Sequence, residues 1–380
     1  MKVIIRCGTF CLNILFGLMK MFPVQKKITY ISRQTNETPL DFQLTIENFR
    51  KKNSEYKHVV LAKMLPEGIM GRLFYCLYMI LQMYHIATSE MVILDSYCIP
   101  VSLLKQRKSL VVIQMWHALG SLKKFGYSIL DQEEGSSSEI AELMKMHKNY
   151  TYVLASSEFA AINFAEAFHV GIEKMKVFPL PKTDLLLDSQ LKNKTITNIY
   201  DEYEQLKKHD KKVIVYAPTF RKNEEADSLK KAILDLIDQI DFNKYELVVK
   251  THFLTEFSVD DKRVIWDKKF TSLEFFHVAD IVITDYSAVL FEALMLDKPI
   301  YFYAFDYDEY MKKRSFYIDY KKEMPGVIGK NAKDLIDAIE NSKDDRKKNQ
   351  IFRKKMVVDC KKTYTDDFVD FILEYLKTNS

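Results

Sequence analysis

The chain has 380 residues, of which 48% are hydrophobic and 28% are charged, and its formal net charge is +4. This length exceeds what one hydrophobic core usually serves, so we expect two domains, and so mild a charge does not support a nucleic-acid-binding protein. The five cysteines are scattered without paired or metal-ligand spacing. They indicate a reducing, cytoplasmic setting and not a disulfide framework.

The N-terminal segment is basic and apolar. Before Glu37 the chain has no acidic residue, and basic side chains flank the apolar run Cys7–Met19. This run is shorter than the roughly 20 apolar residues of a membrane-spanning helix, and no signal-peptide cleavage site follows it. We predict that residues 1–26 lie in the interface of an anionic membrane; the alternative is a terminal helix packed on the protein. A second apolar stretch, Leu73–Ala87, predicts a buried or surface-docked helix.

In the first half of the chain, strand-like segments alternate with helical patterns. The expected strands are Lys27–Ser32, His58–Ala62, Met91–Asp95, Leu110–Trp116 and Tyr152–Ala155, followed by a helix that runs through Phe168. Such alternation predicts a mostly parallel sheet covered on both faces. The polar stretch Asp184–Lys212 then predicts a linker with a helix at Asn198–His209.

The alternation restarts after this linker. The expected strands are Val213–Ala217, Tyr245–Lys250, Val264–Trp266, Ile281–Thr284 and Ile300–Tyr303, and the expected helices are Asp227–Ile240, Leu273–Val278 and Ala288–Leu296. The simplest architecture is α/β, with two doubly wound domains at residues 27–187 and 188–380. A ligand would then lie between them, at the carboxyl ends of the strands.

Residues 280–305 form the most informative stretch, a strand–turn–helix–turn–strand pattern. Ser287 is the expected N-cap of its helix, and backbone N–H groups at such a helix start can hold a phosphate. Glu292 lies about one turn into the helix, within reach of a ribose hydroxyl. The stretch predicts a nucleotide diphosphate site; an ordinary capped αβ unit is the alternative.

Three further strand ends carry polar residues. His117 follows an apolar strand, and a histidine there can take a proton from a hydroxyl; the alternative is a histidine that caps the next turn. Arg221 ends another strand with Thr219, and its fork suits a phosphate, although a solvated loop arginine is equally consistent. His252 follows a third strand in Val-Lys-Thr-His.

Together these strand ends suit transfer of a phosphoryl-linked group, with one base for the attacking hydroxyl and with cations for a diphosphate. The chain lacks the Gly-x-x-x-x-Gly-Lys-Ser/Thr phosphate loop, which argues against an ordinary ATPase or kinase. It also lacks an Asp-x-Asp motif at a strand end. We therefore expect neither a metal ion nor a cofactor.

Four motifs now point to a known family. They are Trp-His-x-x-Gly-x-x-Lys-Lys-x-Gly, Ala-Pro-Thr-Phe-Arg, Lys-Thr-His and Thr-Asp-Tyr-Ser-x-x-x-x-Glu. In this order and spacing, from about Lys27 to Ile328, the chain resembles the CDP-glycerol glycerophosphotransferases of Gram-positive wall teichoic acid synthesis.

The resemblance implies a GT-B fold of two facing Rossmann-like domains, peripheral on the cytoplasmic face of the cell membrane and associated with it through the N-terminal domain. It also implies transfer of a polyol phosphate, with glycerol phosphate expected, from a CDP-polyol to an undecaprenyl-linked saccharide acceptor, with release of CMP. The length favours a primase-like enzyme over a polymerase. The alternatives are a ribitol-phosphate transferase, a GT-B glycosyltransferase that uses a nucleotide sugar, and a non-catalytic assembly partner. The oligomeric state stays open.

The resemblance also implies roles for single residues. His117 would deprotonate the acceptor hydroxyl, and His252 would assist the departure of CMP. The diphosphate contacts would be Thr219, Arg221 and Ser287, and Glu292 would contact the ribose. The other motif residues expected to bind substrate are Gly120, Lys123, Lys124, Lys250 and Asp285.

Four positions depart from the family pattern. Ala118 and Phe253 follow the two histidines where glycine and proline are common, Ala288 replaces a second serine, and Lys182 stands where arginine is frequent. Position 288 therefore lacks the hydroxyl for one expected phosphate contact, although its backbone N–H remains.

Overall fold

The structure is a computed structural model, which describes residues 2–66, 68–208, 210–221, 224–252, 255–341 and 344–378. Its contacts divide the chain into two compact units. Unit 1 comprises Met1–Ala118, Phe125–Lys182 and Val358–Ser380, and unit 2 comprises Leu119–Lys124 and Thr183–Val357. The chain therefore enters unit 2 at Leu119, two residues after His117, and returns to unit 1 after six residues.

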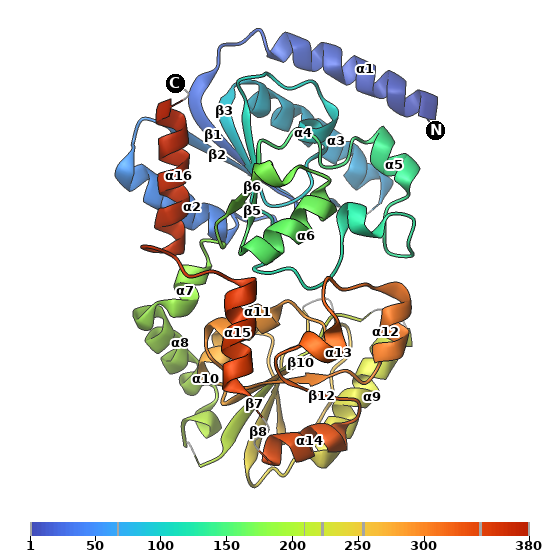
Figure 1. Cartoon of the computed structure of the whole chain (residues 1–380), viewed down its shortest axis with the longest axis vertical. Helices are drawn as coiled ribbons and strands as arrows, with labels where there is room; N and C mark the ends of the chain where they lie inside the picture. Colours follow the sequence, from blue (N-terminus) through green and yellow to red (C-terminus); the bar gives the residue numbers. More distant parts are fainter. Residues whose placement is uncertain are drawn as a thin grey trace. The chain divides into compact units, whose positions relative to one another are not determined.

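Unit 1 is built on a parallel six-stranded sheet in the order β2-β1-β3-β4-β5-β6, counted over the described residues (Figure 1). The strands are β1 Gln25–Ser32, β2 Lys57–Ala62, β3 Ser89–Leu94, β4 Val111–Gln114, β5 Tyr152–Ala155 and β6 Met175–Val177. The helices are α1 Lys2–Met19, α2 Leu40–Lys52, α3 Ile69–Ala87, α4 Ile99–Leu103, α5 Ser138–Leu143, α6 Glu158–Phe168 and α16 Tyr364–Thr378, with 3₁₀ turns η1 Gly126–Ile129 and η2 Ile172–Lys174.

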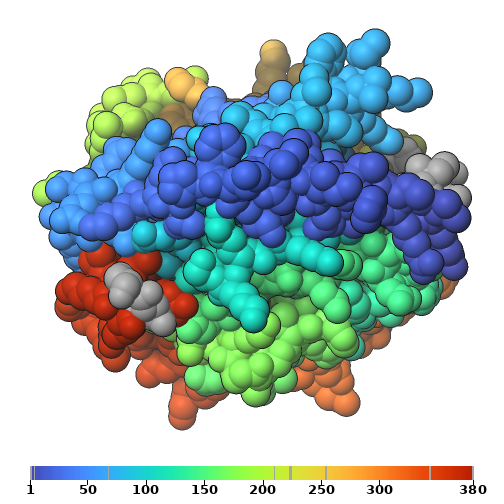
Figure 2. Space-filling view, turned by 90° about the horizontal axis from the view of Figure 1, so that it is seen from above, coloured from blue at the N-terminus to red at the C-terminus, as the bar shows by residue number. Residues whose placement is uncertain are grey.

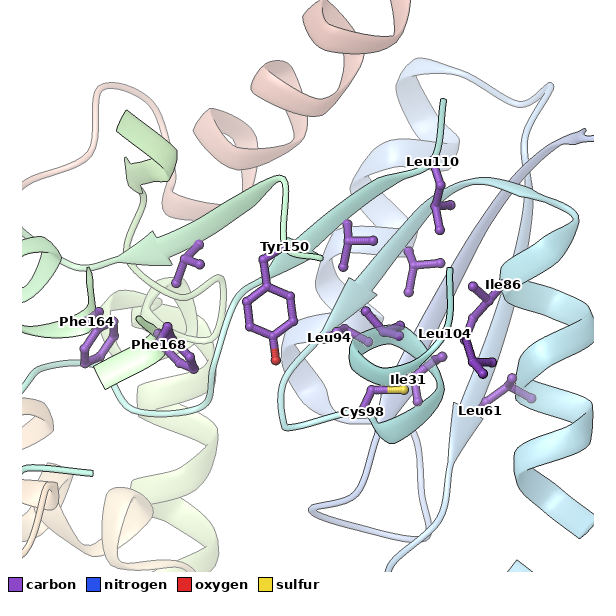
Figure 3. Close-up of a cluster of buried hydrophobic side chains, with 14 of the residues drawn as sticks. Ile31, Leu61, Ile86, Leu94, Cys98, Leu104, Leu110, Tyr150, Phe164 and Phe168 are labelled. Carbon is purple, nitrogen blue, oxygen red and sulfur yellow. The ribbon is translucent and has the colours of Figure 1, made fainter. Parts of the chain in front are cut away.

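Side chains that alternate along the strands of unit 1 build two cores, one on each face of the sheet. Val92 and Leu94 of β3 pack on one face with α3, α4 and α6, as Figure 3 shows for part of this cluster. Met91 and Ile93 pack on the other face with α2 and α16. Burial of both faces is typical of a parallel sheet covered by helices.

Unit 2 has a second parallel sheet, in the order β12-β11-β10-β7-β8-β9 within the described ranges. The strands are β7 Lys212–Ala217, β8 Tyr245–Val249, β9 Val264–Trp266, β10 Ile281–Thr284, β11 Ile300–Tyr303 and β12 Val327–Gly329. The helices are α7 Thr183–Leu187, α8 Ser189–Glu202, α9 Glu224–Gln239, α10 Ser272–Val278, α11 Val289–Met295, α12 Tyr307–Lys313, α13 Tyr320–Glu323, α14 Ala332–Glu340 and α15 Arg346–Met356, with the 3₁₀ turn η3 Glu204–Lys208.

The strand order reverses once in each sheet, between β1 and β3 in unit 1 and between β7 and β10 in unit 2. In open parallel sheets, ligands bind outside the carboxyl ends of the strands at this reversal. Both units are therefore Rossmann-like α/β folds, which confirms the expected fold class of each. The membrane-associating segment remains a prediction.

Three expectations about the chain's organisation differ from the structure. The C-terminal helix α16 belongs to unit 1 and not to a domain at 188–380, because its apolar side chains bury against α2 and the first sheet. The supposed linker begins as helix α8, since Asp188 caps it by accepting from Gln190 and Leu191 N–H. That helix ends at Glu202, and His209 lies outside the described residues.

Candidate active site

The first part of the candidate site lies at the carboxyl edge of the unit 1 sheet. Ser32 ends β1, Asp95 follows β3, and His117 comes three residues after β4. Because these strands are neighbours and parallel, their ends meet at one edge, beside the reversal of strand order. The predicted base therefore lies where a sheet of this kind binds its ligand.

The imidazole of His117 has a defined orientation. Its Nδ1 lies 2.9 Å from the backbone carbonyl oxygen of Asp95. A carbonyl only accepts, so the Nδ1–H donates and Nε2 keeps its lone pair. Burial lowers the pKa of His117, and the hydrogen bond to Asp95 offsets part of that change. The ring is therefore neutral near pH 7 and can accept a proton at Nε2.

Two buried carboxyl groups near His117 were missed by sequence reasoning. Burial raises the pKa of Asp95 to about 6 and also raises the pKa of Asp41. Asp41 Oδ1 accepts from the backbone N–H of Lys182 at 2.7 Å, and Lys182 Nζ lies 3.3 Å from the carbonyl oxygen of His117. The lysine that replaces the family's frequent arginine thus contacts the backbone of the predicted base. Asp95 follows a strand, so the rule that singled out His117 applies to it as well.

Asp285 organises the second part of the site, at the reversal between β7 and β10. Its side chain is fully buried, and Oδ1 accepts from Thr219 N–H at 2.8 Å, from Thr219 Oγ1 at 2.6 Å and from Tyr286 N–H at 2.6 Å. Oδ2 lies 3.0 Å from Arg221 Nη2. The loops that follow the two strands are therefore joined by one carboxylate.

Arg221 is held by carboxylates on two sides. Besides Asp285, its Nε donates to Asp306 Oδ2 at 2.8 Å, and Tyr286 donates its hydroxyl to Oδ1 of the same residue at 3.1 Å. Burial alone would lower the pKa of Arg221, but Asp285 and Asp306 raise it above its usual value. The side chain is 1% exposed. In this structure Arg221 joins loops through Asp285 and Asp306, an arrangement that sequence does not indicate because Asp306 lies 85 residues away.

Lys250 is also a buried cation that is paired with a carboxylate, whereas His252 lies at the surface. Lys250 is buried, and its Nζ donates to Asp267 and to the carbonyl oxygen of Phe270. His252 is exposed, with its ring 5.0 Å from that of Phe220, and burial lowers its pKa somewhat. The neighbouring departure from the family pattern, Phe253, lies outside the described residues.

The segment after His117 is built into unit 2. Lys124 N–H donates to the carbonyl oxygen of Ser315 at 2.8 Å, and Tyr317 N–H donates to that of Leu122 at 3.0 Å. A Cβ on Gly120 would lie 2.6 Å from the ring of Phe291, so this glycine serves close packing. The nearby Lys123 has its pKa lowered by burial to about 8, although Asp285 partly opposes the shift.

The helix after β10 starts one residue later than expected. Ala288 is the N-cap of α11 and makes no side-chain cap, so Ser287 lies one position before the cap. The Oγ of Ser287 is 3.5 Å from Val289 N, a weak contact at most. Glu292 is on this seven-residue helix and is buried. The structure brings Thr219, Asp285 and Ser287 to one sheet edge.

These features define a two-unit Rossmann-like α/β protein with polar loops at both strand-order reversals. The chain belongs to the CDP-glycerol:poly(glycerophosphate) glycerophosphotransferase family, whose sequence profile matches residues 15–373. It is 30% identical over 374 residues to the teichoic acid ribitol-phosphate primase of Bacillus spizizenii, which covers 96% of this chain and 95% of that protein.

Two other proteins are similar across most of the chain. The teichoic acid glycerol-phosphate primase of Bacillus subtilis is 30% identical over 355 residues, which covers 89% of this chain and 90% of that one. The structure of the wall teichoic acid polymerase TagF has a TM-score of 0.72 at 20% identity, covering 99% of this chain and 97% of that chain. The latter shows a shared fold.

Proposed function

We propose that this chain transfers a polyol phosphate from a CDP-polyol to a hydroxyl group of a lipid-linked saccharide in teichoic acid synthesis. Membership of the family supports the reaction class. The single observation that carries the mechanism is the neutral imidazole of His117, with its proton held on Nδ1 by the Asp95 carbonyl.

In the proposed step, Nε2 of His117 accepts the proton of the acceptor hydroxyl as its oxygen attacks the phosphorus atom that bears the polyol. A new P–O bond to the acceptor forms, the bond to CMP breaks, and CMP leaves with the electron pair. His252 assists its departure. Positioning and charge stabilisation supply most of the catalysis in such transfers.

The diphosphate is proposed to bind at the loops after β7 and β10, with Thr219, Ser287, Lys123 and Lys124 as contacts, and Glu292 is proposed for the ribose. Arg221 and Asp285 then act by holding these loops, and Lys250 joins the loop after β8 to the loop after β9, since all three are buried and paired with each other or with neighbouring carboxylates.

Glycerol phosphate is our proposal for the transferred group. Ribitol phosphate is the second candidate, because a ribitol-phosphate primase is 30% identical over nearly the full length of both chains. CMP release from CDP-glycerol and from CDP-ribitol, each with and without a lipid-linked saccharide, tests the proposal. Acceptor-dependent CMP from one donor is expected. CDP binding without acceptor-dependent CMP from either donor would contradict it.

We further propose that unit 1 docks peripherally on the cytoplasmic face of an anionic membrane through residues 1–26. Among the described residues, none of the helices combines the length and hydropathy that a bilayer crossing requires. Phe16 anchors α1 in the core, while Phe10 and Leu18 stay exposed on a helix that runs along the surface of unit 1 (Figure 2). Serine at both exposed positions should release the protein from anionic vesicles; unchanged sedimentation with the vesicles would refute the proposal.

A further inference from the structure

A buried amide lies behind the catalytic corner of unit 1. Gln114, the last residue of β4, is 0% exposed. Its Oε1 accepts from Trp116 N–H at 3.0 Å, and its Nε2 donates to the carbonyl oxygen of Ser96 and to the Tyr150 hydroxyl, both at 3.1 Å. The N–H can only donate and the carbonyl can only accept, so the orientation of the amide is fixed.

These hydrogen bonds connect the two segments that hold the imidazole of His117. Trp116 precedes His117, and Ser96 follows Asp95, whose carbonyl oxygen accepts from His117 Nδ1. The amide of Gln114 therefore holds the Asp95–Ser96 segment, whose Asp95 carbonyl orients the His117 ring, in a fixed position relative to the backbone at Trp116. Loss of the hydrogen bond to Ser96 or to Trp116 would let the two segments shift, and the His117 ring would then move relative to the Asp95 carbonyl oxygen.

The backbone of Trp116 needs this support. Its φ is 61°, in the left-handed region that a bulky side chain adopts only when its surroundings impose it. The indole stacks on Phe125 with ring centroids 4.7 Å apart and packs edge-on against Phe168. The stack holds the side chain, and Gln114 holds the N–H.

The hydrogen bond from Gln114 Nε2 to Tyr150 leads on to a second hydrogen-bonding contact, between Tyr150 and His147. Tyr150 accepts from Gln114, and its hydroxyl oxygen lies within hydrogen-bond distance of His147 Nδ1, 3.0 Å away. Burial lowers the pKa of His147 to about 4, which leaves that ring neutral and able to accept. Figure 3 shows Tyr150 among apolar side chains, between Leu94 and Phe168. The hydrogen bonds of this branch join Tyr150 to Gln114 and to His147, and not to Trp116 or Ser96, so Tyr150→Phe supplies a matched control.

We propose that Gln114 is a positioning residue for the transfer reaction: it clamps the Asp95–Ser96 turn to the Trp116–His117 corner and so aims Nε2 of His117 at the acceptor hydroxyl. The proposal rests on the proposed function of His117 as the base. Gln114 acts through His117 and has no expected contact with CDP-polyol. Its loss should therefore lower kcat and leave the KM for the CDP-polyol unchanged.

The kinetic test compares Gln114→Met, which keeps the length of the side chain, and Gln114→Glu, which replaces the amide N–H donors by a carboxyl group, with Tyr150→Phe. We expect both Gln114 variants to lower kcat by up to about 100-fold, the loss that a 1 Å displacement of a catalytic group can cause. Tyr150→Phe should keep kcat near the wild-type value at a comparable loss of thermal stability. Unchanged kcat in the Gln114 variants, or an equal loss in Tyr150→Phe, would overturn the proposal.

A second readout is independent of turnover. The chain has two tryptophans, so Trp266→Phe leaves Trp116 as the sole tryptophan, which excitation at the red edge of its absorption selects over the tyrosines. Gln114→Met should shift the emission of Trp116 and increase its quenching by acrylamide, and Tyr150→Phe should not. Unchanged emission and quenching in Gln114→Met would overturn the clamp. Absence of CMP release by the wild-type protein, together with the expected fluorescence change, would instead refute the proposed function alone.

Discussion

Replacement of Arg221 by methionine tests whether a buried cation holds the loops of unit 2 together. The guanidinium is 1% exposed and its partner Asp285 is 0% exposed, so the variant leaves a buried carboxylate without its ion-pair partner. Removal of one partner from such a pair costs about 3–5 kcal/mol. At roughly 2–4 °C per kcal/mol for a domain of this size, unit 2 should melt about 6–20 °C lower.

The assay follows thermal unfolding by the fluorescence of Trp266, with Trp116→Phe as the background, because the two tryptophans lie in different units. Arg263→Met is the matched control, since that arginine is exposed and pairs with Asp261 at the surface. Exposed ion pairs contribute little, so its melting should be close to that of the parent. An Arg221→Met variant that melts like the control would refute the role of Arg221 as a clamp.

Three further predictions concern the site. Activity should rise with pH as His117 loses its proton, with an apparent pKa below 6.5, because a base must be neutral to act. A pH profile of kcat/KM checks this prediction. The rise should persist in Asp95→Asn, a control that is needed because Asp95 itself titrates in this range. A rise centred above pH 6.5 would contradict the assignment of His117 as the base. Gly120→Ala should destabilise unit 2 by about 1–3 kcal/mol in denaturant, since its Cβ meets the buried Phe291, whereas Gly17→Ala has open space and should not. His252→Ala should lower kcat by about 100-fold or more while CDP-polyol binding, measured by calorimetry, survives; an unchanged rate would remove His252 from the site.

Local patterns predicted the strands well. The expected strands Tyr152–Ala155, Val264–Trp266, Ile281–Thr284 and Ile300–Tyr303 match β5, β9, β10 and β11. Their β-branched runs between turn residues leave little freedom of assignment. The strand before His117 was predicted to run two residues too far, to Trp116, because the positive φ of Trp116 ends the pairing and depends on contacts with Phe125 and Phe168, which are distant in sequence.

The strand-end rule found His117, Thr219 and Ser287 because the carboxyl edge of a parallel sheet collects such residues. It could not tell a buried cation from a free one. Arg221 and Lys250 meet Asp306 and Asp267, whose positions depend on how distant loops fold back on the sheet. Sequence separation hid these partners.

The same limit applies to residues that hold the base. Gln114 is a polar residue inside an otherwise apolar predicted strand, and the strand pattern alone assigns it no role. Its contact with Ser96 depends on β4 pairing with β3 in register, Gln114 opposite Leu94. The destination of α16 was equally hidden, since an apolar helical stripe predicts burial but does not name the surface that buries it.

The most direct test of the proposed mechanism is acceptor-dependent CMP release by His117→Ala, measured in a single turnover, beside calorimetric binding of the CDP-polyol. We predict that release falls by at least about 100-fold while the Kd for the donor stays at the wild-type value, because His117 serves the acceptor hydroxyl and not the donor. Undiminished turnover by His117→Ala would contradict the assignment of His117 as the base.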